Sequence, residues 1–546
     1  MIFYRSVKYE EFFGGDNMSV KEKKISIERA VSAESVGVSS KVVQSFVDRC
    51  MKLDKQLHSL IVIRHGKVAC EAYRDPYGPE YRHMMYSVSK SFTSTAIGFA
   101  IDEGLFKLDT RFVEIFPEAR GDKPDEYLEK MTVEDLLTMR SGLSVTPFMD
   151  KTKDRWFHDI LSSKWVSEPG TKFLYISENM YLLCCIIKKV TNMGVIDYLM
   201  PRLFEPLGID RPFWETCPRK IEAGGWGLMI RTEDLAKFTL CYQQGGKFGG
   251  KQIVPEWWVK TATSFHADNS MNEELDSKQG YGYCFWRNGG CKESYRADGM
   301  FSQFGIVFEE YDACFISTGG EIDEQRMRDV IWEFFPRAFD DNAKEEDAVE
   351  VSIPAYPRLP KRPRAFTEKL LAGKKIVFGK SPILNIAGFP TSVVTLPASF
   401  MARDKAGNIT NVSFDALENE LVMRWSEGKE VNLIHIGMDG EYRWDNITLG
   451  HTPYTTCAVG CWNSERELEV HIRAIETTAE RILVFTFADG KVTMKPSMRP
   501  ASEAMAVTLK ESVKSVVKQP LLQAVVSEAL PYVVPIVDTA LHGKIV

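Results

Sequence analysis

The sequence contains no apolar run of the roughly 18 residues that a membrane span needs, and no surplus of basic charge. Its 68 Lys and Arg residues stand against 75 Asp and Glu residues, which gives a net charge of -7. The first absence argues against a membrane-spanning protein, and the second argues against a nucleic-acid-binding one. We therefore expect neither a membrane nor a nucleic acid among the partners of this protein.

The N-terminus lacks the pattern of a secretory signal, which combines a basic start, a long apolar core and a small-residue cleavage site. Residues 19–38 are charged and polar, and residues 1–38 are expected to form a loose lead-in. Gly14 and Gly15 stand shortly before Met18. Two Gly codons shortly before a Met codon could be a ribosome-binding site that has been read as protein, so we hypothesise that Met18 is the true start. The missing secretory signal predicts a cytoplasmic protein.

Cysteine pairs and metal-ligand motifs are also missing. The 11 Cys residues are an odd number scattered through apolar stretches, which predicts buried, reduced thiols. Cys457 and Cys461 could form a ligand pair, but no second Cys or His pair accompanies them at zinc spacing. The nine His residues form no His-Glu-x-x-His motif, and the chain has no Gly-x-Ser-x-Gly elbow. We expect neither a metal nor another cofactor.

What the sequence does contain is a Ser-x-x-Lys tetrad at Ser87 and Lys90, at the start of a helix predicted to run to Glu103. Residues three apart share one face of a helix. In the first turn, unpaired N–H groups and the positive end of the helix dipole favour an alkoxide and disfavour an ammonium. A Lys there is pushed toward its neutral form, which can take the proton of a hydroxyl. The tetrad also fits an ordinary Ser-capped amphipathic helix, and alone it does not separate the two interpretations.

Two further blocks follow the tetrad. The segment 104–109 begins with Gly104, which ends the first helix. In the segment 131–143, Thr132 and Asp135 form a capping-box-like start of a short helix. Together, the three blocks resemble the serine β-lactamase superfamily, in particular the class C β-lactamase-like hydrolases, which include esterases and nylon-oligomer hydrolases. The resemblance implies an α+β fold of the β-lactamase/transpeptidase type, in which helices flank an antiparallel sheet.

The resemblance assigns the catalytic Tyr to Tyr175, which would shuttle a proton between Ser87 and the leaving group. This role needs a group of tunable pKa that Lys90 can hold partly ionised. The third position of the family's Tyr-x-Asn motif is Ser177 or, displaced by two residues, Asn179, and it is expected to contact the substrate carbonyl. The alternative for Tyr175 is an aromatic core residue at the start of a helix.

A third motif of the family matches residues 295–308, which are predicted to form an edge-like strand. By resemblance, Gly299 lets the backbone approach the substrate, and the N–H of Met300 joins that of Ser87 to form an oxyanion hole. Gln303 completes the Gly-x-x-small-Gln pattern of the esterase-like branch and is a candidate substrate-binding residue.

Two more positions bear on the substrate. Trp226 lies in a Gly-rich turn that resembles a block of the esterase branch, where it would line the pocket or serve as a structural Trp. Thr232, shortly after it, is expected to cap a helix. Ala297 stands where β-lactamases and penicillin-binding proteins carry a Lys or His that helps to bind the substrate carboxylate. The missing cation argues against penicillin recognition as the main function.

The composition changes near residue 340. A charge run and four prolines within ten residues predict a linker at 341–365, after a hydrolase domain at 39–340. Alternating strands at 366–500 predict a small all-β domain, similar to the lipocalin-like domain appended to some of these hydrolases. Residues 501–546 are expected to form a helical tail that packs on a domain or on a partner subunit, and the second arrangement would give a homo-oligomer.

The resemblance implies acyl transfer, and three functions stay open. The first is a carboxylesterase or amidase that acts on a small-molecule ester or amide. The second is a β-lactamase or D-peptidase, which Ala297 and the expected cytoplasmic location disfavour. The third is a catalytically silent binding module of the same fold, which the intact Ser87, Lys90, Tyr175 and Gly299 disfavour. We expect the first.

Overall fold

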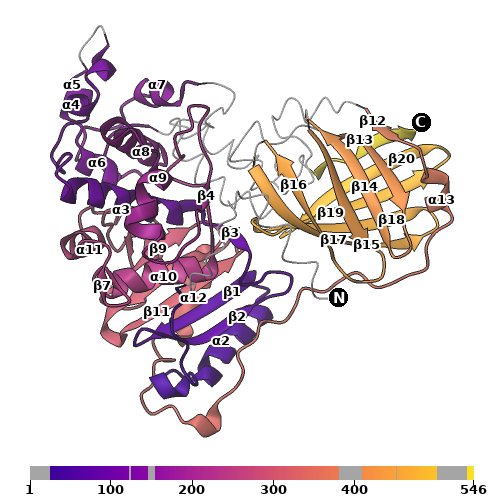
Figure 1. Ribbon diagram of the computed structural model, residues 1–546, viewed down its shortest axis with the longest axis horizontal. Coiled ribbons are helices and arrows are strands. Elements are labelled where there is room, and N and C mark those ends of the chain that lie inside the picture. Colours follow the sequence, from indigo (N-terminus) through magenta and orange to yellow (C-terminus); the bar gives the residue numbers. More distant parts are fainter. Residues whose placement is uncertain are drawn as a thin grey trace.

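The computed structural model describes residues 25–121, 125–144, 154–379, 409–428, 430–450, 452–500 and 538–546. In Figure 1 these residues form two bodies, one of helices around a sheet and one built almost entirely of strands. The hypothesis about Met18, most of the predicted lead-in and most of the predicted tail lie outside the described residues.

The first body is built on a six-stranded antiparallel sheet in the order β2-β1-β11-β10-β9-β8. β1 is buried along its whole length because both faces of the sheet are covered there, whereas β2 alternates buried and half-buried residues. β1 and β2 form a hairpin. The strands are β1 (Leu57–Arg64), β2 (Lys67–Tyr73), β8 (Trp286–Arg287), β9 (Ser294–Gly299), β10 (Gln303–Phe308) and β11 (Ala313–Gly319).

Three helices enclose this sheet. α2 (Ser40–Lys52) and α12 (Glu324–Phe334) pack together on one face, and α10 (Thr232–Gln243) covers the other face against β1, β10 and β11. α2 begins at Ser40, because the Ser39 side chain accepts the N–H of Val42 as an N-cap. The apolar stripe of α2 then faces the sheet.

The predicted cap of α10 is wrong by one residue. Arg231 is the N-cap, and its N–H is held by the Asp234 carboxylate at 3.0 Å, while the Thr232 hydroxyl bonds to the Ser59 hydroxyl on β1 at 2.8 Å. Thr232 therefore ties the helix to the sheet. The interior of a sheet offers a hydroxyl partner that a local pattern does not reveal.

A group of helices completes the first body around α3 (Ser89–Asp102) and α8 (Glu178–Thr191), which pack against each other. Every residue of α3 from Ser89 to Ala100 is buried, as in a helix that runs through a protein core. The predicted capping box between Thr132 and Asp135 is present at the start of α6. The other helices are α4 (Phe112–Ile115), α5 (Glu126–Lys130), α6 (Val133–Leu137), α7 (Trp156–Leu161), α9 (Val195–Leu199) and α11 (Glu256–Thr263).

Short elements connect these parts. The strand β3 (Arg82–Met84) leads toward α3 and pairs with β5 (Leu228–Arg231), which pairs with β4 (Phe213–Trp214). A separate short hairpin consists of β6 (Lys247–Phe248) and β7 (Lys251–Gln252). Single turns of tighter or wider helix are η1 (Glu34–Val36), η2 (Tyr86–Val88), η3 (Pro117–Arg120), η4 (Met200–Phe204), η5 (Leu275–Ser277), η6 (Glu309–Tyr311) and η7 (Glu345–Asp347).

The second body is a ten-stranded sheet in the order β15-β14-β13-β12-β21-β20-β19-β18-β17-β16, and β15 at one end also pairs with β17, the neighbour of the strand at the other end. Alternate residues point inward and form one apolar core. Its elements are α13 (Thr367–Leu371), β12 (Ile376–Phe378), β13 (Ile409–Ala416), β14 (Glu420–Glu427), β15 (Glu430–Gly437), β16 (Arg443–Leu449), β17 (Thr452–Ser464), β18 (Glu467–Ala474), β19 (Glu480–Ala488), β20 (Lys491–Arg499) and β21 (Leu541–Ile545).

The prediction of a helical tail is wrong at its end. Leu541–Ile545 form β21, which lies between β12 and β20 and pairs with both. Leu541 and Gly543 are buried while His542 and Lys544 are exposed, which is the period of a strand. The last residues thus complete the closed sheet.

The two bodies touch along one edge (Figure 1) and share apolar packing. Met84 and Tyr86 of the first body belong to the same core cluster as the inward side of the closed sheet. The N–H of Met84 donates to the carbonyl of Glu476, in the turn between β18 and β19, at 2.8 Å. Tyr81 stacks on Trp444 with ring centroids 4.9 Å apart.

The segment predicted as a linker runs along the first body. The N–H of Val349 donates to Ser40 Oγ at 2.8 Å, and the Tyr356 hydroxyl donates to Gln56 at 2.8 Å. Arg358 forms ion pairs with Asp75 and with Glu441 of the closed sheet. The predicted domain boundaries stay predictions.

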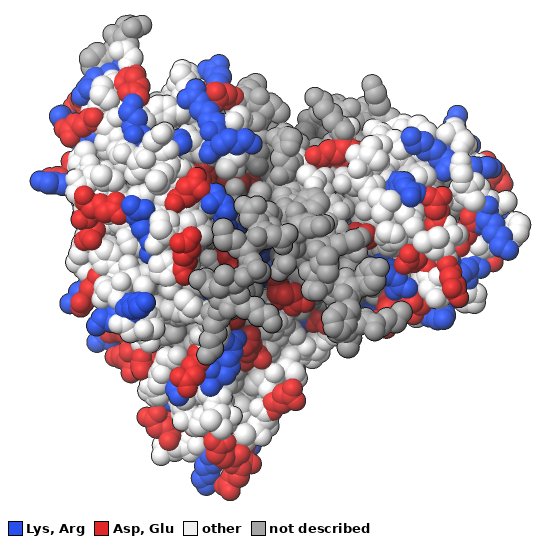
Figure 2. Space-filling view, in the orientation of Figure 1, with Lys and Arg blue, Asp and Glu red and all other residues white. Residues whose placement is uncertain are grey.

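Acidic and basic side chains are interspersed on the face drawn in Figure 2, and the described residues on that face gather into no patch of one sign. All eleven cysteines are buried and unpaired, as predicted. Helices long and apolar enough to cross a bilayer do not occur in the described parts of the chain.

Candidate active site

Ser87 lies in η2, which continues directly into α3. The residue before it, Tyr86, has a φ of 44°, a left-handed conformation that costs a tyrosine energy and persists only when the surroundings hold it. The Tyr86 ring is buried and packs edge-on against Phe301 with centroids 5.0 Å apart. Ser87 itself is half-buried, so its hydroxyl is carried at the end of a rigid, buried segment.

Lys90 reaches Ser87, as the tetrad predicts. Its Nζ lies 2.9 Å from Ser87 Oγ, 3.1 Å from Ser177 Oγ and 2.7 Å from the Gly225 carbonyl oxygen. Burial lowers the pKa of Lys90 to about 7, and the nearby Cys284 and more distant acids offset only part of that effect. Near neutral pH a large fraction of this amine is therefore uncharged and can accept a proton.

Tyr175 is brought close to the same hydroxyl. Lys90 Nζ lies 4.7 Å from the centre of its ring. Burial raises the pKa of the phenol well above its ordinary value, and the nearby Ser87 hydroxyl offsets only part of the rise. The expectation that Lys90 holds this phenol partly ionised is not met, because burial favours the neutral form of both groups.

Of the two candidates for the third position of the Tyr-x-Asn motif, Ser177 contacts Lys90, whereas Asn179 contacts Ser141. Asn179 is fully buried and accepts a hydrogen bond from the Ser141 hydroxyl at 2.8 Å. Ser177 also touches the turn that carries Gly225, where a Cβ in place of the glycine hydrogen would lie 2.7 Å from Ser177 Cβ. Glycine at position 225 thus allows its carbonyl to reach Lys90.

Gly299 ends β9 directly beside the Ser87 segment. A Cβ at this position would lie 2.3 Å from the Met85 carbonyl oxygen, so only glycine allows the two backbones to approach. The strand is not an edge strand, which corrects the sequence prediction. Its partner β8 pairs only with Tyr295 and Arg296, however, so the Gly299 end of β9 extends beyond β8.

Met300 follows Gly299 in a tight turn to β10. Phe301 and Ser302 both have left-handed backbones, with φ of 67° and 68°. Gln303 stabilises this turn from behind, because its amide donates to the carbonyls of Met300, Phe301 and Gly319 at 3.2, 3.0 and 2.9 Å. The side chain expected to bind substrate is therefore placed as a support of the turn.

Trp226 is also placed differently from the pocket-lining expectation. Its indole N–H donates to Glu215 at 3.2 Å, its ring lies 5.9 Å from that of Trp156, and only 6% of the residue is exposed. These contacts fit the alternative of a structural Trp. Its neighbour Gly225, not its ring, contributes to the site.

A family model described as beta-lactamase matches residues 45–317, half of the chain. The chain belongs to the beta-lactamase family. The match extends from α2 into β11 and includes Ser87, Lys90, Tyr175 and Gly299. The predicted family is confirmed, and with it the arrangement of helices around an antiparallel sheet, while the likeness of the closed sheet to lipocalins stays a prediction.

Individual relatives of this beta-lactamase-family chain cover parts of it. The 6-aminohexanoate-dimer hydrolase of Paenarthrobacter ureafaciens is 26% identical over 237 residues, 40% of this chain and 59% of that protein. Penicillin-binding protein 4 of Amycolatopsis lactamdurans is 26% identical over 199 residues, 29% of this chain and 50% of that protein. The chain thus spans little more than half the length of these curated relatives. The crystal structure of a family VIII carboxylesterase is 15% identical, with a TM-score of 0.47, and covers 57% of this chain and 98% of that one.

Sequence reasoning missed several residues of this beta-lactamase-family site. Tyr281 and Trp286 pack around Tyr175, with centroids 6.1 and 5.1 Å from its ring. The aromatic density of residues 281–286 was a signal that could have drawn attention to them. The Gly225 carbonyl and Glu324, which contacts the turn after Gly299, gave no such signal.

Proposed function

We propose that this chain is a serine hydrolase that cleaves a small ester or amide through an acyl-enzyme on Ser87. The observation that carries the proposal is the 2.9 Å contact between Lys90 Nζ and Ser87 Oγ, in surroundings that lower the pKa of Lys90 to about 7. A surface Lys beside a Ser would be an ammonium and could not act as a base at that pH. Here burial supplies the neutral amine that a serine nucleophile needs.

In the proposed reaction, Lys90 takes the proton of Ser87 as Oγ attacks the carbonyl carbon. The negative oxygen that forms is held by the backbone N–H groups of Ser87 and Met300. Tyr175 donates its phenol proton to the departing alcohol or amine and regains a proton from the Lys90 ammonium. The net movement carries one proton from Ser87 to the leaving group, and water then releases the acid by the reverse sequence.

The charges beside the site support a neutral substrate over a β-lactam. At position 297 the strand carries Ala, and the cation next to it, Arg296, is only 1% exposed. The Arg296 guanidinium is held by Asp298 at 2.5 Å and by Asn288 at 2.6 Å. It is therefore committed to the protein and not presented to a substrate carboxylate.

The test uses a fluorophosphonate probe, a short-chain p-nitrophenyl ester and a chromogenic cephalosporin, each with the wild type and with Ser87→Ala. We expect ester turnover and probe labelling that Ser87→Ala abolishes and that Ser45→Ala, an exposed change on α2, leaves intact. Cephalosporin turnover far above ester turnover would favour a β-lactamase. Absence of labelling and turnover in the wild type would favour a silent binding module and overturn the proposal.

A further inference from the structure

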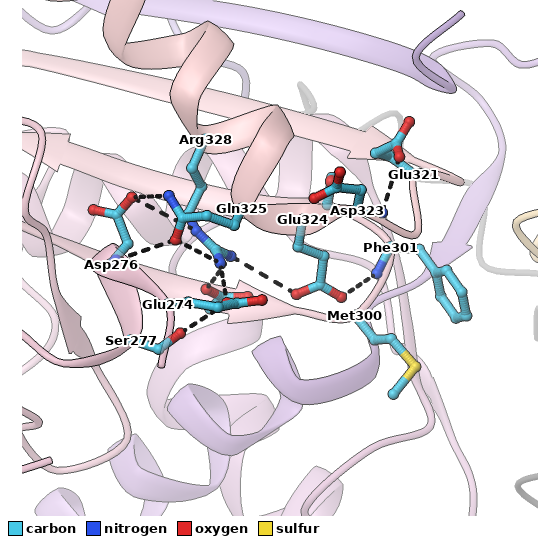
Figure 3. Close-up of polar contacts among 12 residues, drawn as sticks. Glu274, Asp276, Ser277, Met300, Phe301, Glu321, Asp323, Glu324, Gln325 and Arg328 are labelled. Carbon is cyan, nitrogen blue, oxygen red and sulfur yellow. Dashed lines mark hydrogen bonds and ion pairs between the residues drawn. The ribbon is translucent and has the colours of Figure 1, made fainter. Parts of the chain in front are cut away.

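The turn that presents the Met300 N–H is held by a carboxyl group from another element. Glu324 is the first residue of α12, and its Oε1 accepts the backbone N–H of Phe301 at 2.9 Å. Figure 3 shows this carboxyl facing the turn from the start of the helix. About a quarter of the side chain, 24%, is exposed.

This contact completes a clamp on a single peptide group. The peptide between Met300 and Phe301 has its N–H held by Glu324 and its carbonyl held by the Gln303 amide at 3.2 Å. The next two residues, Phe301 and Ser302, are both left-handed, which costs non-glycine residues on the order of 1 kcal/mol each. A turn under such strain relaxes unless contacts hold it.

Glu324 is itself kept in place by Arg328, one helical turn later. The Arg328 guanidinium is only 1% exposed and lies among four carboxylates, as Figure 3 shows in part. They are Glu274 at 2.7 Å, Asp276 at 3.8 Å, Asp298 at 3.6 Å and Glu324 at 3.8 Å. Because Asp298 immediately precedes Gly299, the same guanidinium also ties α12 to the strand end that leads into the Gly299–Gln303 turn.

We propose that Glu324 is a positioning residue of the oxyanion hole: by holding the Met300–Phe301 peptide, its carboxyl aims the Met300 N–H at the carbonyl oxygen of the substrate. The inference rests on the proposed function, because it needs the Met300 N–H to act as a donor. Arg328 already has three other carboxylates around it, so its guanidinium does not depend on the charge of Glu324. What Glu324 supplies is an acceptor oxygen at the right distance from the Phe301 N–H, and its charge is secondary.

Two variants separate reach from charge. Glu324→Asp keeps the charge but withdraws the carboxyl by one methylene, and Glu324→Gln keeps the reach and the acceptor oxygen but removes the charge. We expect Glu324→Asp to lower kcat for the p-nitrophenyl ester by roughly tenfold to a hundredfold with little change in KM, because the misaimed donor acts in the transition state. We expect Glu324→Gln to stay close to the wild type.

A second readout reports the oxyanion hole itself. An ester and its thiono analogue, with sulfur in place of the carbonyl oxygen, are compared, because aimed N–H donors prefer oxygen. The preference for the oxygen ester should fall in Glu324→Asp and persist in Glu324→Gln. A loss of stability alone would not change this ratio. Glu324→Met keeps the length without an acceptor and should behave as Glu324→Asp does, which keeps the test decisive if one variant does not fold.

Glu333→Asp, at the exposed far end of the same helix, is the matched control and should change neither readout. The inference is overturned if Glu324→Asp and Glu324→Met keep both the wild-type kcat and the oxygen preference, or if Glu324→Gln is the impaired variant while Glu324→Asp is active. Ser87→Ala is measured in parallel. If wild-type turnover does not depend on Ser87, the proposed function fails first, and that outcome is distinct.

Discussion

At the scale of single residues, the protonation of Lys90 follows from the neutrality of its partners. Its amine contacts two hydroxyl oxygens and one carbonyl oxygen, and no carboxylate is among its hydrogen-bond partners in the described residues. A hydroxyl or carbonyl satisfies the donors of the amine without stabilising a full charge as strongly as a carboxylate would. Burial therefore controls its pKa.

We expect kcat/KM to fall as the pH drops through about 7, because protonation of Lys90 removes the base. The sign follows from the lowered pKa: above it the amine is free, and below it the ammonium cannot accept the proton of Ser87. A pH–rate profile for a p-nitrophenyl ester, with the Ser87→Ala rate subtracted, measures the midpoint. Lys90→Arg, which stays charged, should lose at least about a hundredfold at every pH. A profile that is flat from pH 5.5 to 9 would contradict the role of Lys90 as base.

The residues of the site differ in how far the sequence could predict them. Ser87 and Lys90 are three apart on one helix, so their meeting is a local property. Tyr175 came from a resemblance, and Ser177 and Asn179 could not be distinguished without their partners. The Gly225 carbonyl lies 135 positions from Lys90 in the sequence, and its contact depends on how two distant segments pack. Sequence periodicity carries no information about such a contact.

At the scale of elements, the turn between β18 and β19 joins the closed sheet to the segment that leads to Ser87. Glu476 in this turn is fully buried, and both of its carboxyl oxygens accept the N–H of Thr455, at 3.1 and 2.9 Å. Its carbonyl accepts the N–H of Met84. Burial raises the pKa of this carboxyl from 4.5 to about 7, and the backbone N–H hydrogen bonds that it accepts, including that of Thr455, offset only part of the rise.

Because the folded-state pKa of Glu476 is raised, its contribution to stability is fully present below pH 4.5 and is lost as the pH rises through about 7. The loss is on the order of 3 kcal/mol. Glu476→Gln cannot titrate, so its free energy of unfolding relative to the wild type should rise between pH 5 and pH 8. Denaturant unfolding at the two pH values measures this difference, and Glu418→Gln, exposed in the turn after β13, controls for the loss of one negative charge. A constant difference between the two proteins would refute the assignment.

The elements that were not predicted from the sequence were missed for the same reason. In the sequence alone, β21 cannot be distinguished from the apolar tail before it. Its hydrogen bonds come from β12 and β20, which are far away in the sequence. β9 has the composition of an edge strand, but two residues of β8 cover its first half. Strands whose neighbours are distant in sequence leave only a weak local pattern, whereas the capping box of α6 joins two residues three apart in the sequence and was predicted correctly.

At the scale of the whole molecule, the two bodies share apolar packing. Met84, Tyr86, Met229 and Phe301 of the first body lie in one cluster with the inward residues of the closed sheet. Tyr86 and Phe301 flank the two proposed backbone donors, so the closed sheet supports the site from behind. The composition predicted two parts, but the packing between them depends on side chains that no local pattern marks as an interface.

This shared packing predicts cooperative unfolding. Phe485→Ala removes a fully buried ring of the closed sheet, 5.2 Å from Phe414, and should cost about 3–5 kcal/mol. We expect it to lower, by the same amount, the temperature at which ester turnover is lost and the temperature of the calorimetric transition. Val431→Ala, 73% exposed on the same sheet, is the control and should shift neither. Two separate transitions, with turnover lost only at the unshifted one, would show that the bodies unfold independently.

The eleven buried, unpaired cysteines give the molecule an internal reporter of its own opening. They are spread over both bodies, with Cys50 and Cys314 in one and Cys457 and Cys461 in the other. An alkylating reagent reaches these buried residues far more slowly in the native state than once the chain has opened completely. The mass of intact molecules after brief alkylation therefore distinguishes an opening confined to one body from an opening of the whole chain.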